Sequence, residues 1–178
     1  RDRSDRGVRT KGRRGEGEME IRAAVITVSD TRGIDDDLSG TKLSELLQTY
    51  GAEVLVRRVI TDDLSHLRET IYSLAEREDI NLIITTGGTG FSARDNTPEA
   101  TRAVIEREAP GMAEAMRRET ASKHPMAMLS RGVCGIRGNT LIINLPGSPK
   151  GVEECFAVIR PVLRHAVKLI NGEALHEN

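Results

Sequence analysis

The amino-acid sequence predicts a single α/β domain, and three observations carry that prediction. From residue 20 onward, short aliphatic runs alternate with segments of helical periodicity, which is the pattern of strands joined by helices. One run, Leu82–Ile84, has no polar alternation, as expected of a strand that is buried on both faces. The length of 178 residues suits one domain with a core of its own.

Composition and charge limit the function classes. The hydrophobic content is 38% but the aromatic content is only 2%, so we expect an aliphatic core. A net charge of -1 gives no overall attraction to nucleic acid or to a membrane surface, and we expect neither as a partner. No apolar stretch approaches the ~18 residues of a membrane span, and no signal-peptide core precedes the first strand. We therefore expect a cytoplasmic protein.

The two cysteines, Cys134 and Cys155, lie in apolar runs and lack the spacing of metal ligands. Cysteine in such a setting behaves as a small hydrophobic residue. We expect two buried free thiols rather than a disulfide or a nucleophile.

Residues 1–18 differ from the rest of the chain. They hold seven Lys or Arg, four Asp or Glu and four glycines, and Val8 is their only aliphatic residue. Such a segment cannot bury enough apolar surface to offset its ordering entropy. We expect a disordered basic tail or leader before a domain at 19–178, and a basic arm for RNA or an acidic partner is the alternative.

The first predicted strand covers residues 21–28, and Ser29 and Asp30 follow it. Ligands of open α/β sheets gather at the carboxyl ends of strands, so both residues are site candidates, with a cap or turn as the alternative. The stretch 31–38 contains three aspartates, which we interpret as the solvated charge of a mobile loop rather than a cation site. Ser39 is the expected N-cap of the helix that follows.

A second strand is predicted at 53–60, and Asp62 and Asp63 follow it. The next helix carries leucine and isoleucine on one face. One of the two aspartates can cap this helix, and the cap does not need both. The pair therefore offers one structural carboxylate and one that is available for chemistry.

The third strand runs into Gly87-Gly88-Thr89-Gly90 and then into a helix, with Thr97 as expected N-cap and Pro98 as first residue. Glycine permits a positive φ and lets an anion approach the backbone amides. Strand, glycine turn and helix make the geometry of a phosphate cradle, and a tight turn without a ligand is the alternative. The segment matches neither the P-loop nor the dinucleotide fingerprint. Arg94 and Asp95, between turn and helix, suit phosphate and a metal ion or proton.

The middle of the chain contains fewer candidate site residues. The helix from Pro98 is expected to carry Ile105 and to break at residues 109–111, and a further helix is expected at 112–123. We interpret Arg117 and Arg118 of that helix as a solvated face. Two short strands around an Arg-Gly-Asn turn predict a hairpin.

A second glycine turn follows the strand predicted at 140–145. The residues Pro146-Gly147-Ser148 lead into the last helix, with Ser148 as N-cap and Pro149 as first residue. Pro161 should kink that helix. The two strand–glycine–helix junctions could face one ligand from two sides.

Four separated segments, in order, carry a family resemblance. They are Thr85–Gly90 (Thr-Thr-Gly-Gly-Thr-Gly), Arg94–Ala100 (Arg-Asp-Asn-Thr-Pro-Glu-Ala), Leu129–Arg131 (Leu-Ser-Arg) and Gly135–Ser148 (Gly-Ile-Arg-Gly-Asn-Thr-Leu-Ile-Ile-Asn-Leu-Pro-Gly-Ser). With them the chain resembles the MogA/MoaB family and the G domain of gephyrin. The resemblance extends over nearly the whole chain apart from the tail.

The resemblance implies a three-layer α/β/α sandwich with a mostly parallel central sheet. It implies an enzyme that uses ATP and Mg²⁺ to adenylylate the terminal phosphate of molybdopterin, releasing pyrophosphate. By analogy Asp62 and Asp95 match the two active-site aspartates, and we expect them to hold Mg²⁺ and position the substrates. The resemblance also implies a homotrimer or homohexamer.

The same resemblance implies the substrate-binding residues. Ser130 matches the serine that helps to hold the molybdopterin phosphate, and we expect Arg131 beside it to contact phosphate. The segments that line the nucleotide and pterin pockets match Gly87, Gly88, Thr89, Gly90, Pro146, Gly147 and Ser148. Ser29, Asp30 and Ser39 are further carry-overs from the family.

Two other functions stay open from the sequence. A member of the family can bind the pterin without adenylylating it, although the presence of both aspartates favours an enzyme. The same fold can serve as an interaction module, as in the scaffolding use of the gephyrin domain. Pyrophosphate release would separate the enzyme from the binding module.

Overall fold

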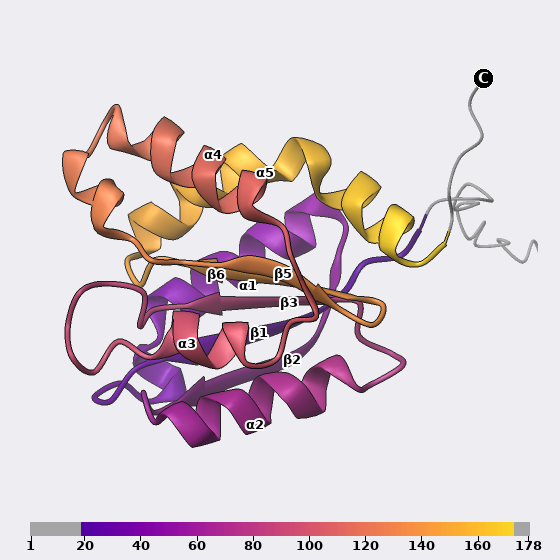
Figure 1. Ribbon diagram of the computed structural model, residues 1–178, viewed down its shortest axis with the longest axis horizontal. Helices are drawn as coiled ribbons and strands as arrows, with labels where there is room; N and C mark the ends of the chain where they lie inside the picture. The colour runs from indigo at the N-terminus through magenta and orange to yellow at the C-terminus, as the bar shows by residue number, and fades with distance from the viewer. Residues whose placement is uncertain (1–18, 173–178) are drawn as a thin grey trace, which may run out of the picture.

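Six strands form one sheet in the order β2-β1-β3-β6-β5-β4 in the computed structural model, which describes residues 19–172 (Figure 1). The strands are β1 (Arg22–Val28), β2 (Glu53–Ile60), β3 (Leu82–Thr86), β4 (Arg107–Glu108), β5 (Cys134–Arg137) and β6 (Thr140–Leu145). The strands β2, β1, β3 and β6 run parallel, whereas β5 and β4 extend the sheet by antiparallel pairing. The predicted mostly parallel sheet is confirmed, and so is the predicted hairpin, which β5 and β6 form.

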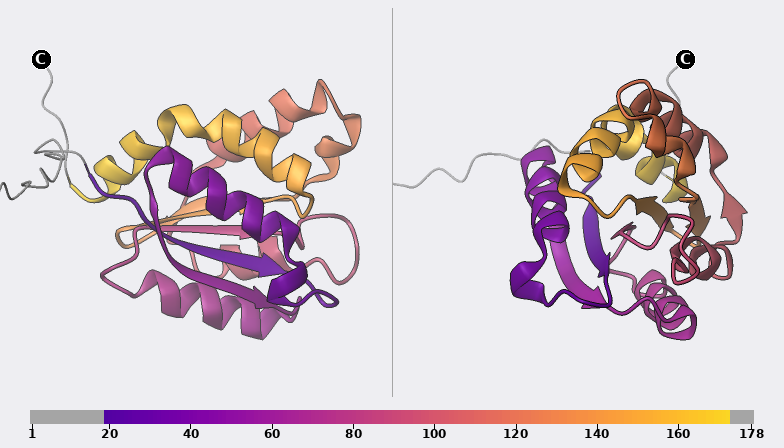
Figure 2. Two further views of the ribbon diagram at one scale, coloured as in Figure 1. Left: turned by 180° about the vertical axis from the view of Figure 1, so that it is seen from behind. Right: turned by 90° about the vertical axis from the view of Figure 1, so that its left-hand side faces the viewer.

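Helices cover both faces of this sheet (Figure 2). They are α1 (Leu38–Tyr50), α2 (Leu64–Ala75), α3 (Thr97–Arg102), α4 (Pro110–Ala121) and α5 (Pro149–Ile170), with 3₁₀ turns η1 (Ile34–Asp36) and η2 (Pro125–Leu129). The core under α1, α4 and α5 is separate from the core under α2 and α3, so the three-layer sandwich is confirmed. None of the helices in residues 19–172 is long and apolar enough to cross a membrane.

The core is largely aliphatic because the inner strands are apolar on both faces. Side chains of a strand alternate between its two faces. Leu82 and Ile84 of β3 lie in the cluster under α1, α4 and α5, whereas Ile83 lies in the cluster under α2 and α3. All three side chains are fully buried, so the predicted two-sided burial of this strand is confirmed.

The topology makes the loops after neighbouring strands diverge at the carboxyl end of the sheet. β1 lies between β2 and β3, and the loop after β1 leads to the α1 layer. The loop after β3 leads to α3, on the opposite face. Ligands of open α/β sheets bind where neighbouring loops diverge in this way. The residues at this end, directly after the parallel strands, are Ser29, Thr61, Gly87 and Pro146.

The start of α1 differs from the prediction. Asp37, not Ser39, is the N-cap, and its side chain accepts a hydrogen bond from the backbone N of Gly40. Asp37 is only 1% exposed, because the hydroxyl of Thr27 and the guanidinium of Arg57 also donate to it. Of the three consecutive aspartates, only the first two are solvated as expected.

The region after the first glycine turn also differs. α3 ends at Arg102, so Ile105 lies outside it, and the chain then forms β4, which the sequence pattern did not predict. The two residues of β4 are held because the backbone N groups of Glu106 and Ala109 donate to β5 carbonyls. α4 already begins at Pro110, before the expected helix start.

Three further predictions concern α5, the cysteines and the tail. Pro161 lies inside α5, which continues through it, and a kink there stays a prediction. Cys134 and Cys155 are buried and free as expected, and burial raises their pKa values to about 12 and about 11. The tail at 1–18 lies outside the described residues.

Candidate functional site

The first glycine turn directly follows β3 and lies against the end of β1. Gly87 and Gly88 have φ values of 100° and 65°, in the left-handed region that glycine adopts without strain. A Cβ on Gly87 would lie 2.5 Å from the carbonyl oxygen of Val28, the last residue of β1. The predicted need for glycine at this turn is therefore confirmed, both by its dihedrals and by its close approach to β1.

The second glycine turn packs directly against the first. A Cβ on Gly147 would lie 3.2 Å from Cα of Gly87. The hydroxyl of Thr86 donates to the carbonyl of Pro146 at 2.6 Å, and the N of Gly87 donates to Leu145 O at 3.1 Å. The two strand–glycine–helix junctions thus lie side by side, as the sequence suggested.

Several backbone amides at these turns have no acceptor among residues 19–172. They are the N–H groups of Gly88, Thr89 and Gly90 in the first turn and of Gly147 and Ser148 in the second. The side chain of Ser148 caps α5 as expected, accepting from Gly151 N at 3.0 Å. The amides of Gly147 and Ser148 directly precede α5, where a helix N-terminus favours an anion, whereas those of Gly88, Thr89 and Gly90 lie in the loop before α3.

The two predicted active-site carboxylates both lie against the first turn. A Cβ on Gly88 would be 3.0 Å from Oδ2 of Asp62, and one on Gly90 would be 2.9 Å from Oδ2 of Asp95. The backbone N of Asn96 donates to Oδ1 of Asp62 at 3.0 Å. The two side chains therefore approach the same turn from different loops.

Asp63 is the structural member of its pair, as predicted. Its Oδ1 caps α2 by accepting from the N of His66 at 2.8 Å. Asp62 does not cap α2, so its carboxylate is available for chemistry. Burial is the main reason that its pKa is raised. The negative charges of Asp95 and Asp30 raise that pKa further.

Each carboxylate of the pair has an oxygen that could bind a magnesium ion shared with a phosphate. Oδ2 of Asp62 and Oδ1 of Asp95 accept no hydrogen bond from any residue in 19–172. A cation beside them would also relieve the repulsion that raises the pKa of Asp62. The described residues contain no group of three or more metal-binding side chains, but Mg²⁺ commonly takes one or two carboxylates and completes its shell with phosphate oxygens and water.

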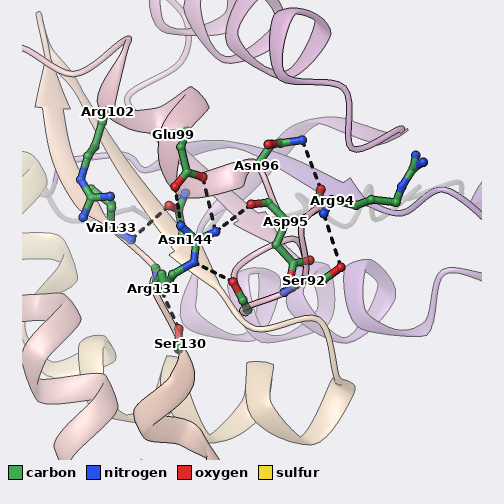
Figure 3. A network of polar contacts seen from close by, with 12 residues as sticks. Ser92, Arg94, Asp95, Asn96, Glu99, Arg102, Ser130, Arg131, Val133 and Asn144 are labelled. Carbon is green, nitrogen blue, oxygen red and sulfur yellow. Dashed lines mark hydrogen bonds and ion pairs between the residues drawn. The ribbon is translucent and has the colours of Figure 1, made fainter.

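Arg131 holds the glycine loop (Figure 3). Its Nε donates to the carbonyl of Gly90 and its Nη2 to that of Asp95, each at 2.7 Å. It also forms an ion pair with Glu99, whose pKa is lowered mainly by this hydrogen bond. With these partners the guanidinium positions the loop, and its expected phosphate contact stays a prediction.

Two adjoining cavities open beside the turns. The first has a volume of about 300 Å³ and is lined by Ala113, Met116, Arg117, Thr120, His124, Ala127, Ser130, Gly132, Asn144, Pro146, Ser148, Lys150, Gly151, Glu154 and Cys155. The second has a volume of about 350 Å³ and is lined by Gly88, Thr89, Gly90, Asp95, Met126, Ala127, Leu129, Ser130, Pro146 and Gly147. Ala127, Ser130 and Pro146 line both, so Ser130 stands in the wall between them.

The first cavity carries two cationic side chains, those of Arg117 and Lys150. Arg117, His124 and Lys150 line it, and its acidic residue Glu154 lies 3.2 Å from Nε2 of His124. Arg117 is half-buried and donates to the carbonyl of Gly132 at 2.9 Å, so its interpretation as a solvated residue was wrong. Arg118, next in sequence, is exposed as expected.

The three other residues that the family resemblance assigned to the site, Ser29, Asp30 and Ser39, have different positions. The hydroxyl of Ser29 accepts from the backbone N of Thr31 and Arg32, which makes it a turn residue at the end of β1. Asp30 lies nearer the site, since it accepts from the N of Asp62 at 3.0 Å. Ser39 is buried beside Asp37 and lines neither cavity, so its expected place in the site is not supported.

Asn144 is a site residue that sequence reasoning did not single out. It is buried, it lines the first cavity, and its Oδ1 accepts from the N of Val133 at 3.1 Å. Its Nδ2 donates to the hydroxyls of Thr85 and Thr101. The one available signal was an asparagine inside an otherwise aliphatic strand, which a buried polar network explains.

A family described as "Probable molybdopterin binding domain" matches residues 24–165. The chain belongs to this family. A relative of this chain is the molybdopterin adenylyltransferase of Helicobacter pylori, 37% identical over 162 residues, which cover 89% of this chain and 92% of the relative. The resemblance drawn from the four sequence motifs is thereby confirmed.

Two other relatives extend the comparison. The molybdenum cofactor synthesis protein cinnamon of Drosophila melanogaster is 42% identical over 156 residues, which are 86% of this chain but only 26% of cinnamon. This chain thus spans about a quarter of that relative. The crystal structure of the molybdopterin biosynthesis enzyme MoaB from Thermus thermophilus matches with a TM-score of 0.79 and 44% identity, over 85% of this chain and 97% of that one.

Proposed function

We propose that this protein acts in molybdenum cofactor biosynthesis as a molybdopterin adenylyltransferase. It transfers AMP from ATP to the terminal phosphate of molybdopterin and releases pyrophosphate. The observation that carries the proposal is the pair of cavities that meet at Ser130, one beside free amides and a carboxylate, the other with two cationic side chains.

ATP fits the second cavity. The unpaired amides of Gly88, Thr89 and Gly90 point donors at a phosphate, and the carboxylate of Asp95 lies beside them. Met126 and Leu129 supply apolar surface on the same cavity, which suits a purine ring. The second cavity therefore offers polar surface for the phosphates of ATP and apolar surface for its base.

Molybdopterin fits the first cavity. Arg117 and Lys150 favour an anionic ligand, and the hydroxyl of Thr120, which donates to the carbonyl of Met116, can accept a hydrogen bond from a polar ring system. The wall at Ser130 leaves the terminal phosphate of this substrate beside the ATP cavity. The hydroxyl of Ser130 can donate to that phosphate at the boundary.

The chemistry needs positioning and charge neutralisation more than covalent help from the protein. An oxygen of the terminal phosphate attacks the α-phosphorus of ATP, a new P–O bond forms, and the bond to the β-phosphate breaks as pyrophosphate leaves. The free amides stabilise charge on the α-phosphoryl group, and Arg131 keeps their loop in place. Asp62 and Asp95 would hold Mg²⁺, which offsets the repulsion between two polyanions.

The assembly and compartment are part of the proposal. We expect a homotrimer or homohexamer in the cytoplasm. An apolar groove between α4 and α5, lined by Met112, Val158 and Val162 among others, supports self-association. Two free thiols suit a reducing compartment. Light scattering after size exclusion would give the mass, and a monomer at micromolar concentration would contradict the oligomer.

The direct experiment incubates the protein with molybdopterin, ATP and Mg²⁺ and measures pyrophosphate. We expect release that depends on all three additions and is lost in Asp95→Asn. We also expect that variant to retain molybdopterin binding, since the first cavity is unchanged. Binding of both substrates by the natural protein without pyrophosphate would instead make it a pterin-binding module.

A further inference from the structure

Arg94 lies in the loop after the first glycine turn, and its side chain is 73% exposed. It extends away from Arg131 and Glu99, toward the other side of the loop (Figure 3). Within the described chain, its Nε and Nη2 lie 2.7 and 2.6 Å from one oxygen, Oδ2 of Asp30. A guanidinium has five N–H groups, so most of the donors of Arg94 face solvent.

Asp30 fixes this arginine beside the carboxylate pair. The other oxygen of Asp30, Oδ1, accepts from the backbone N of Asp62 at 3.0 Å. The charge of Arg94 lowers the pKa of Asp62, which places the guanidinium within electrostatic reach of that carboxylate. Asp30 thus connects the ends of β1 and β2 to the loop that carries Arg94.

The two arginines of this region are held very differently. Arg131 donates to two backbone carbonyls and to Glu99, and these contacts fix the loop. Within residues 19–172 the side chain of Arg94 has one partner, Asp30, and exposed ion pairs contribute little to stability. Arg94 is therefore the cation beside the glycine turn that can change partner without disturbing the fold.

The position of Arg94 also selects one end of the nucleotide. Neither cavity is lined by Arg94 while it is paired with Asp30. The α-phosphorus of ATP must lie near Ser130, where the second substrate approaches, and the leaving group must point away from the attacking oxygen. The β- and γ-phosphates then point away from Ser130, toward the solvent-exposed side of Asp62 and Asp95 where Arg94 lies.

We infer that Arg94 is a phosphate-binding residue. In the absence of nucleotide it pairs with Asp30, and when ATP binds it exchanges this partner for the β- and γ-phosphates. The inference rests on the proposed function, because it assigns the leaving pyrophosphate to this side of the site. The exchange is favourable because a guanidinium binds phosphate oxygens through two parallel hydrogen bonds, whereas its present contact uses one carboxylate oxygen.

The test is calorimetric titration of Arg94→Ala with ATP and Mg²⁺, with pyrophosphate and Mg²⁺, and with AMP. We expect the Kd for ATP and for pyrophosphate to rise about 10- to 100-fold, as for lost charge-assisted hydrogen bonds. AMP lacks the two outer phosphates, so its Kd should change less than about twofold, within the scatter of surface substitutions. Equal weakening of AMP and ATP, or no change for either, would overturn the inference.

Arg118→Ala is the matched control, because Arg118 is 72% exposed and likewise pairs with one carboxylate, that of Glu119. It lines neither cavity, and we expect no change in any of the three titrations. Arg94→Lys separates charge from geometry: a partial recovery of ATP affinity supports a phosphate contact. Unchanged melting temperatures in these variants would exclude unfolding as the cause.

Asp30→Asn tests the holding role of the aspartate. The amide oxygen can still accept from Asp62 N, but Arg94 loses its counter-charge, so ATP affinity should stay equal or increase. A loss as large as that of Arg94→Ala would mean that the intact ion pair is required, which contradicts the exchange. If the natural protein does not bind ATP at all, the proposed function fails first; if it binds and Arg94→Ala matches it, only the inference fails.

Discussion

Asp37 and Asp62 are both aspartates near the start of a helix, yet their surroundings are opposite. Asp37 is 1% exposed, and its carboxylate accepts hydrogen bonds from the N of Gly40, the hydroxyl of Thr27 and the guanidinium of Arg57. Three donors therefore compensate the buried charge of this carboxylate. Buried carboxylates are tolerated only under such conditions.

Asp62 has fewer hydrogen-bond donors than Asp37 among the described residues, and negative charges lie near it. It accepts from the backbone N of Asn96, and the charges of Asp95 and Asp30 oppose its ionisation. A carboxylate whose acceptors are all used stabilises the fold, whereas a carboxylate with few donors beside like charges is suited to a cation. Perturbed groups of this kind concentrate at functional sites.

The largest effect should come from removing a charge of the carboxylate pair. In Asp62→Asn or Asp95→Asn we expect adenylyl transfer to fall by at least about a thousandfold, or about 4 kcal/mol in the barrier. The folded structure should persist, because the asparagine oxygen can still accept from the backbone N groups of the loop. Initial rates of pyrophosphate release measure the loss, and a rate within tenfold of the natural protein would contradict the roles assigned to these residues.

The buried carboxylate of Asp37 should instead control stability. Asp37→Ala leaves Arg57 without its counter-charge and the N-terminus of α1 uncapped, so we expect a loss of about 3 kcal/mol in the free energy of unfolding. Asp37→Asn keeps an oxygen for Gly40 and should lose less. Urea denaturation gives both values. A stable Asp37→Ala protein with impaired ATP binding would reverse the distinction between the two aspartates.

The first turn can be tested with two glycines that share a positive φ. Gly87→Ala places a Cβ 2.5 Å from the carbonyl of Val28, so we expect a loss of about 2–3 kcal/mol in stability together with weakened ATP binding. Gly138 has a φ of 52°, and a Cβ added there would meet no atom within 4 Å. Gly138→Ala should therefore cost only about 1 kcal/mol and leave ATP binding intact. Equal effects in the two variants would show that the contact with β1 does not matter.

The smallest effect concerns the stability of the nucleotide-free protein. The pKa of Asp62 is raised in the folded state, so ionisation favours the unfolded chain. This penalty is absent below about pH 4, the usual carboxyl range, and is complete above the folded-state pKa. Asp62→Asn should therefore stabilise the protein at neutral pH by less than about 1 kcal/mol, because Asp62 is partly exposed. Melting temperatures measured across pH 3–8 should converge at the acid end, and a destabilised variant at neutral pH would refute the assignment.

The sequence predicted the sheet and most helices because their signals are local. Leu82–Ile84 is apolar on both faces, and Gly87 and Ser148 mark a turn and a cap by residue type alone. β4 has two residues and exists through its pairing with β5, so no local pattern could reveal it. Asp37 resembles its two neighbours in sequence, and only the folded chain brings Arg57, twenty positions away, beside it.

The candidate site was predictable in position but not in the roles of its arginines. Asp62, Asp95 and the glycine turn follow parallel strands or lie in one loop, so topology brings them together. The guanidinium groups of Arg131 and Arg117 bind backbone carbonyls of other segments, and sequence spacing does not show which carbonyls are near. The two cavities likewise arise between elements that are distant along the chain.

The most direct test of the central claim follows the phosphorus atoms of ATP. ATP labelled at the α-phosphate or at the γ-phosphate is incubated with the protein, molybdopterin and Mg²⁺, and the pterin product is isolated. We predict that the α-label appears on molybdopterin and that the γ-label appears only in pyrophosphate. Transfer of the γ-label to the pterin, or no transfer while both substrates bind, would contradict the account.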